Sequence, residues 1–209
     1  LDKLQVTSMP FAGFGAAGHV GLISHSGSTW SGLVGNGRDV AFNIAISAGQ
    51  ELTTTAADYI RYLLTLPSTR VIACVLETVR DPEGFIAALE EAKRKDVPVV
   101  ILKLGRSEAA KHFAISHSGA ISGANGAYEA IFARHNVIAV RTLDELMDSV
   151  EMFRTERVPP ARSFAIGTDS GGERQIIVDL AADMGIPFAR LTAETETKLL
   201  DYLDPGVEP

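Results

Sequence analysis

Short apolar runs alternate with amphipathic segments along most of the chain. The runs are rich in Val, Ile and Leu and are bounded by Gly, Pro, Ser or Thr, as buried strands are. Strands are expected at 19–24, 42–47, 70–76, 97–102 and 137–140. Helices, with apolar residues at helical spacing, are expected at 26–34, 55–64, 81–92, 122–134 and 142–153. Strands that alternate with helices predict a parallel sheet covered on both faces.

The same alternation resumes after a polar, proline-bearing stretch at 155–161. Strands are expected at 163–167 and 187–189, and helices at 173–184 and 193–203. The pattern predicts two doubly wound α/β domains, at 19–154 and 162–209, and the second is expected to be truncated. Residues 1–18 are interpreted as an incoming linker.

Composition and charge exclude several classes of protein. The net charge is −7, and the Lys and Arg residues are dispersed, so no basic face for nucleic acid or an anionic membrane is expected. No apolar run approaches the roughly 20 residues of a membrane-spanning helix. The single cysteine, Cys74, lies in an apolar run and is expected to be a buried structural thiol. These features together predict a cytoplasmic protein.

Two strand-to-helix junctions carry small residues where a helix is expected to begin. The first holds Ser26, Gly27 and Ser28, and the second holds Ser170, Gly171 and Gly172. Free N–H groups and the positive end of the helix dipole form an anion site at such a position, and glycine lets a phosphate approach closely. The alternative is that these residues only cap helices and form turns.

A histidine lies in the long connection between the fourth strand and the next helix. His117 is flanked by Ser116, Ser118 and Gly119, a setting that suits a histidine that accepts a phosphoryl group. The alternative is a polar loop with an incidental histidine. Glu77 directly follows the third strand, where its carboxylate can hold one imidazole nitrogen and leave the other as nucleophile. Its alternative role is to initiate the next helix.

Six motifs, in order, resemble those of the NDP-forming acyl-CoA synthetases, relatives of succinyl-CoA synthetase. They are Ser24-His25-Ser26-Gly27, Ser47-Ala48-Gly49-Gln50, Glu77, Lys103-Leu104-Gly105-Arg106-Ser107, Ser116-His117-Ser118-Gly119-Ala120 and Asp169-Ser170-Gly171-Gly172. The resemblance spans nearly all of 19–203. The departures include His25, where glutamine or arginine is common, and Gln50, where asparagine is common.

The resemblance implies two flavodoxin-like ligase domains and a transient phosphate on His117. It further implies that Glu77 holds this histidine, and that the helices beginning near Ser26 and Ser170 cradle the phosphohistidine between the two domains. CoA, ATP or ADP, and Mg²⁺ are the implied cofactors, with the nucleotide and metal bound mainly outside this chain. No cluster of His, Cys or carboxylate residues has the spacing of a metal site, so none is expected in this chain.

The implied partners are small molecules and further domains. They are an acyl-CoA or carboxylic acid, phosphate, a Rossmann-type CoA-binding domain and an ATP-grasp domain, the last two in the same chain or a partner chain, with a homo-oligomer as a further option. A different class of function, a non-catalytic module that senses acyl-CoA, stays open. A serine hydrolase using Ser26 or Ser118 is disfavoured because neither lies in a G-x-S-x-G elbow.

Overall fold

The computed structural model describes residues 18–38, 40–107, 110, 125–153 and 163–203. The chain divides into two compact units, Leu1–Glu156 and Arg157–Pro209, and each is described by itself.

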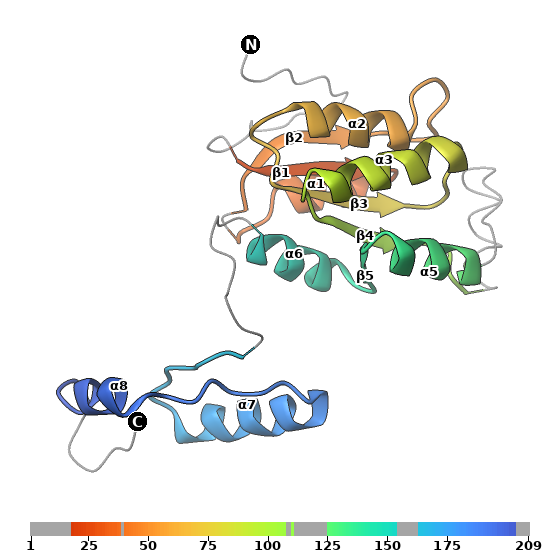
Figure 1. Cartoon of the computed structure of the whole chain (residues 1–209). Coiled ribbons are helices and arrows are strands. Elements are labelled where there is room, and N and C mark those ends of the chain that lie inside the picture. The colour runs from red at the N-terminus through yellow and green to blue at the C-terminus, as the bar shows by residue number, and fades with distance from the viewer. Residues whose placement is uncertain (1–17, 39, 108–109, 111–124, 154–162, 204–209) are drawn as a thin grey trace. The chain divides into compact units, whose positions relative to one another are not determined.

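The first unit is built on a five-stranded parallel sheet (Figure 1). Its strands are β1 (Val20–Ser24), β2 (Phe42–Ser47), β3 (Val71–Leu76), β4 (Val99–Lys103) and β5 (Ile138–Val140). The order β2-β1-β3-β4-β5 is that of flavodoxin. The predicted α/β fold class is therefore confirmed, with strand boundaries that differ from the expected ones by at most two residues.

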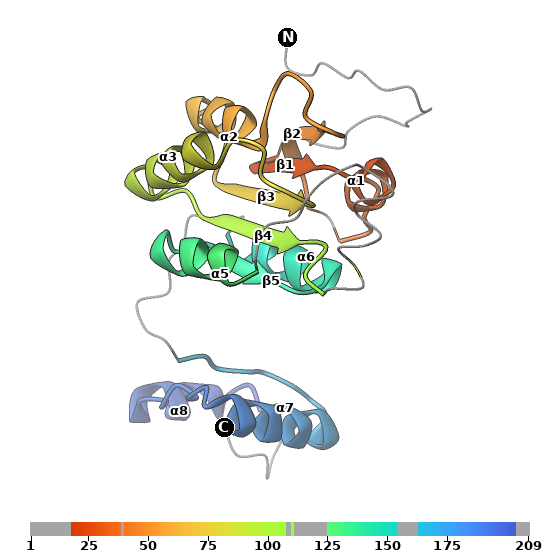
Figure 2. The ribbon, with the colours of Figure 1, turned by 90° about the vertical axis from the view of Figure 1, so that its right-hand side faces the viewer.

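Helices cover both faces of this sheet (Figure 2). One face carries α2 (Ala56–Thr65), α3 (Pro82–Arg94) and α5 (Asn125–Arg134), and the other carries α1 (Gly27–Val34) and α6 (Leu143–Met152). Side chains of β3 alternate between the two apolar layers, with Ile72 and Cys74 in one and Val71 and Ala73 in the other. Because both layers are apolar, every residue of β3 is buried and its sequence is a continuous hydrophobic run.

Side chains at the helix starts explain where the helices begin. Asp81 accepts a hydrogen bond from the Gly84 N–H at 2.9 Å, with Pro82 in the first turn, as the sequence predicts. The Asp58 carboxylate accepts hydrogen bonds from the Thr55 N–H and hydroxyl, both at 2.9 Å. These bonds stabilise the charged form and lower the pKa of Asp58.

Helix α2 lies close to β1 because Gly21 has no side chain. A Cβ atom on Gly21 would lie 2.7 Å from Cδ1 of Leu63, whose side chain is fully buried. This close contact joins the helix to the strand that leads into the candidate site.

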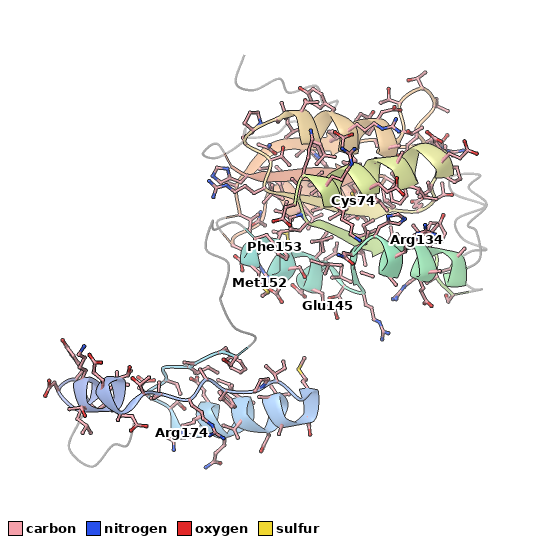
Figure 3. The ribbon with its side chains drawn as sticks, viewed as in Figure 1. Cys74, Arg134, Glu145, Met152, Phe153 and Arg174 are labelled. Carbon is pink, nitrogen blue, oxygen red and sulfur yellow. The ribbon has the colours of Figure 1, made fainter. Side chains whose placement is uncertain are left out.

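Cys74 is buried within β3 (Figure 3). Burial, followed by the negative charge of Glu51, raises the pKa of its thiol. The thiolate is the reactive form, so we expect the native chain to react with an aromatic disulfide reagent at pH 8 at least about 10³-fold more slowly than a free cysteine. Absorbance of the released thiol measures this rate. The urea-unfolded chain is the control, and a native rate equal to the unfolded one would contradict the burial.

The second unit contains α7 (Gly171–Met184) and α8 (Ala193–Leu199). The segments expected to be strands at 163–167 and 187–189 meet only through an isolated parallel bridge between Phe164 and Phe188. The Ala189 N–H donates to the Phe164 carbonyl at 2.8 Å, and the two phenyl rings pack at 4.6 Å. No longer ladder forms among the described residues, so the prediction of full strands was wrong.

Candidate functional site

The candidate site lies at the carboxyl edge of the parallel sheet. Helix α1 follows β1 onto one face and α3 follows β3 onto the other, so the two adjacent strands form a topological switch point. Open α/β sheets bind ligands at such points. His25 follows β1, Glu77 follows β3, Lys103 ends β4 and Glu51 lies shortly after β2.

Both sides of the Glu77 backbone are held by side chains. The Glu77 N–H donates to Nδ1 of His25 at 3.1 Å, and Nζ of Lys103 donates to the Glu77 carbonyl at 2.7 Å. Lys103 is itself buried and its Nζ lies 4.8 Å from the ring centroid of Tyr128. Glu77 is half-buried, and no described residue donates a hydrogen bond to its carboxylate.

His25 and Glu51 form a buried hydrogen-bonded pair. Nε2 of His25 and Oε1 of Glu51 are 2.8 Å apart, and the two side chains are 4% and 0% exposed. Because the Glu77 N–H can only donate, Nδ1 of His25 accepts and Nε2 carries the hydrogen that is donated to Glu51. The ring tautomer is thus fixed from both sides.

Sequence reasoning missed this pair. His25 was noted only as a departure from glutamine or arginine, and Glu51 was not noted at all. The available signal was the position of Glu51, an acid that follows the carboxyl end of β2 by four residues and so belongs to the same edge of the sheet as Glu77. Its backbone φ of 53° lies in the left-handed region, which the sequence does not indicate for a glutamate.

The start of α1 has the geometry of an anion site. The Ser26 hydroxyl accepts a hydrogen bond from the Thr29 N–H at 3.3 Å and lies 3.1 Å from the Ser28 hydroxyl. This cap leaves the N–H groups of Gly27 and Ser28 without a partner in the helix. A Cβ on Gly27 would meet only the Ser47 hydroxyl, at 3.7 Å, so packing within the described residues does not require glycine there.

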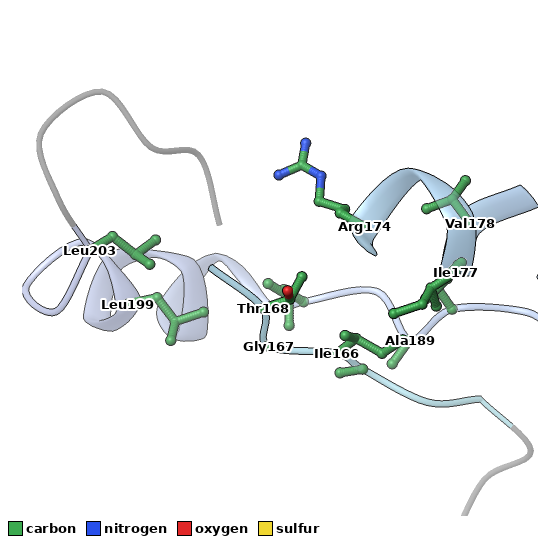
Figure 4. A pocket seen from close by; sticks show the side chains of 12 residues that line it. Ile166, Gly167, Thr168, Arg174, Ile177, Val178, Ala189, Leu199 and Leu203 are labelled. Atoms are coloured by element: carbon green, nitrogen blue, oxygen red, sulfur yellow. The ribbon is translucent and has the colours of Figure 1, made fainter. Parts of the chain in front are cut away.

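The start of α7 repeats this arrangement in the second unit. The Ser170 hydroxyl accepts from the Glu173 N–H at 3.3 Å, and the next two positions are Gly171 and Gly172. An open hollow beside this turn is lined by Ile166, Thr168 and Arg174, among others (Figure 4). Glu173 is an acid in the first turn of α7, and its carboxylate accepts a hydrogen bond from the Thr168 hydroxyl at 3.1 Å.

His117, Ser118 and Gly119 lie outside the described residues. Their assignment, and the expectation that His117 lies between the two units, stay predictions. Among the residues that the structure does describe, no group of three or more His, Cys, Asp or Glu side chains is placed to hold a metal ion. None of the helices in the same part of the chain has the length and apolar character needed to cross a membrane.

Known proteins share both the sequence pattern and the fold of this chain. The α subunit of an ADP-forming acetate–CoA ligase (II) from Pyrococcus furiosus is 32% identical, over 90% of this chain and 41% of its own length. A trans-feruloyl-CoA synthase from an unknown prokaryotic organism is 32% identical, over 86% of this chain and 26% of its own length. The chain therefore spans less than half of these relatives.

A solved structure from Candidatus Korarchaeum cryptofilum, a dinucleotide-forming acetyl-coenzyme A synthetase in complex with phosphate and ADP, superposes with a TM-score of 0.78 at 23% identity. The match covers 91% of this chain and 42% of that one, and it supports the fold. Residues 17–153 match the succinyl-CoA ligase like flavodoxin domain. By this domain, which occupies most of its length, the chain belongs to the NDP-forming acyl-CoA synthetase family.

Proposed function

We propose that this chain supplies the ligase domains of an enzyme that interconverts acyl-CoA, phosphate and NDP with a carboxylic acid, CoA and NTP. In the first step a phosphate oxygen attacks the thioester carbonyl, and the C–S bond breaks to give an acyl phosphate and CoA. A ring nitrogen of His117 then attacks the phosphorus, and the P–O bond to the acyl group breaks to release the carboxylate. An oxygen of the NDP finally takes the phosphoryl group from His117.

In these reaction steps, the residues of this chain position His117 and the phosphoryl group. The Glu77 carboxylate accepts a hydrogen bond from one ring nitrogen of His117, which leaves the other as the nucleophile. The N–H groups of Gly27 and Ser28, and of Gly171 and Gly172, stabilise the charge that spreads over the phosphoryl oxygens. Such a transition state needs little covalent chemistry from the protein beyond the histidine.

The observation that carries the proposal is the link between Glu77 and the start of α1. The Glu77 N–H is hydrogen-bonded to the ring of His25, and the residue after His25, Ser26, caps α1, whose first N–H groups have no partner in the helix and suit an anion. A carboxylate for the histidine and an anion site for the phosphate therefore share one edge of the sheet. That combination fits phosphoryl transfer better than a general ligand-sensing pocket.

The nucleotide, CoA and Mg²⁺ are assigned to other domains. Among the described residues, no group of three His, Cys, Asp or Glu side chains could hold Mg²⁺. We infer that a Rossmann-type CoA-binding domain and an ATP-grasp domain, fused or in a partner subunit, complete the enzyme. The share of 26–41% that this chain has of the two relatives leaves room for such domains.

The test is to label the full-length protein with γ-labelled ATP and Mg²⁺ and to map the label by mass spectrometry. A label that is acid-labile and base-stable, located on His117 and discharged by ADP or by a carboxylic acid with CoA, is the expected result. A label on serine or on another histidine contradicts the assignment. Binding of acyl-CoA by a protein that takes up no label favours the sensing module instead.

Replacing Glu77 with Gln is expected to slow phosphorylation of His117 by about 10- to 100-fold, the usual loss when the partner that orients a histidine is removed. The fold should not change, because the hydrogen bonds to Glu77 in this site use its backbone. Rapid-quench labelling of the full-length protein measures the rate. The control is Glu90→Gln, an exposed glutamate on α3, and equal rates in the two variants would remove Glu77 from the mechanism.

A further inference from the structure

We propose that the buried His25–Glu51 pair is a positioning device for Glu77, and that it sets the rate at which His117 is phosphorylated. This inference rests on the proposed function. It assigns a role to two residues that the phosphate-transfer scheme does not itself require.

The contacts run across the carboxyl ends of three neighbouring strands. Glu51 follows β2 and holds Nε2 of His25, which follows β1; Nδ1 of the same ring accepts from the N–H of Glu77, which follows β3. The His25 N–H also donates to the Val75 carbonyl at 3.0 Å, so the backbone of β3 fixes the position from which the ring extends. The ring therefore transmits the position of Glu51 to the Glu77 peptide.

This arrangement is a costly way to stabilise a fold. The Glu51 side chain is fully buried, its Oε2 has no hydrogen-bonding partner among the described residues, and its backbone adopts a left-handed φ of 53°. Burying a carboxylate costs free energy unless its oxygens are hydrogen-bonded. Strain and incomplete hydrogen bonding of this kind persist where they serve a site. We therefore infer that the pair serves the site that it touches.

The Glu77 peptide is the part of the site that needs such support. His25 holds its N–H and Lys103 holds its carbonyl, so the two peptide planes that flank the Cα of Glu77 are both fixed. A fixed peptide restricts the directions in which the carboxylate can point. A displacement of about 1 Å in a reacting group can cost about 100-fold in rate, which is the scale on which positioning acts.

The test uses three variants of the full-length protein. His25→Phe keeps a ring but has no acceptor for the Glu77 N–H, and is expected to slow His117 phosphorylation by about 10- to 100-fold with little change in the KM for ATP. His25→Gln is expected to restore the rate to within about threefold, because an amide can accept from Glu77 and donate to Glu51. His19→Phe is the control: His19 precedes the opposite end of β1, and its Nδ1 contacts the Ser68 carbonyl at 3.1 Å.

A double variant separates positioning from general damage. If His25 acts through Glu77, His25→Phe combined with Glu77→Gln should be no slower than the slower single variant. Losses that multiply would overturn the proposal, and so would a His25→Phe protein with the wild-type rate. A wild-type protein that never forms phosphohistidine would instead overturn the proposed function.

A less disruptive variant keeps the test decisive where His25→Phe does not fold. Glu51→Gln retains the shape of the side chain, but its neutral amide oxygen accepts from Nε2 more weakly than a carboxylate does, so the ring of His25 is held less firmly. We expect a loss of about threefold or more in the phosphorylation rate of the full-length protein. An unchanged rate in this variant, with a fold intact by circular dichroism, contradicts the proposal.

Discussion

Replacing His117 with Ala is expected to abolish the acid-labile phosphate on the full-length protein and to lower turnover by at least about 10³-fold, as loss of a covalent nucleophile does. Alanine offers no ring nitrogen to attack the acyl phosphate, so the carboxylate is never released and no phosphoryl group reaches the NDP. Both effects are measured on one preparation, by γ-labelled ATP for the phosphoprotein and by release of free CoA for turnover.

The control is His112→Ala, which removes another histidine of the connection between β4 and α5. It should keep both the label and turnover. Label that persists in the His117→Ala protein would show that another group carries the phosphate. An intact thioester-forming activity without any label would instead point to direct transfer between bound substrates.

Replacing Leu63 with Ala is expected to destabilise the first unit by about 2–5 kcal/mol, the usual cost of a fully buried leucine. Leu63 fills the space above Gly21, and its removal leaves a cavity between α2 and β1 that neither backbone can close without moving. Urea unfolding measures the change. The single tryptophan, Trp30, is buried in α1 and reports on this unit alone.

The neighbouring residue provides the matched control. Tyr62 lies on the same helix but is 51% exposed, so Tyr62→Ala should cost about 1 kcal/mol or less. Leu63 and Trp30 pack on opposite faces of the sheet. If Leu63→Ala shifts the Trp30 transition as a whole, the two layers unfold together, whereas an unshifted transition would show that they unfold separately.

Much of the first unit could be predicted because its signals are local. Apolar runs such as 70–76 and caps such as Asp81 are visible within a few residues, and alternating strands and helices specify a parallel sheet. The second unit was predicted less well. The runs at 163–167 and 187–189 have the composition of strands, but a strand also needs neighbours along its length, and these two share a single bridge.

Some residues of the candidate site could likewise be predicted from the sequence, and others could not. Glu77 and the starts of α1 and α7 follow from their place at the ends of strands and helices, which sequence reveals. The contact between Glu51 and His25 joins residues that follow different strands, and Glu51 has a left-handed backbone. No local sequence pattern predicts this contact. The tautomer of His25 depends on a third strand, so it required the sheet to be assembled first.

The burial of Cys74 has a practical consequence for measuring the distance between the two units. Since the only native thiol is sequestered in the sheet, cysteines introduced on the surface can be labelled with dyes without background. Leu52, beyond the carboxyl end of β2, and Tyr202, in the second unit, are each 87% exposed and belong to different units. Energy transfer between dyes at these two positions would measure the distance between the two units in the presence and absence of substrates.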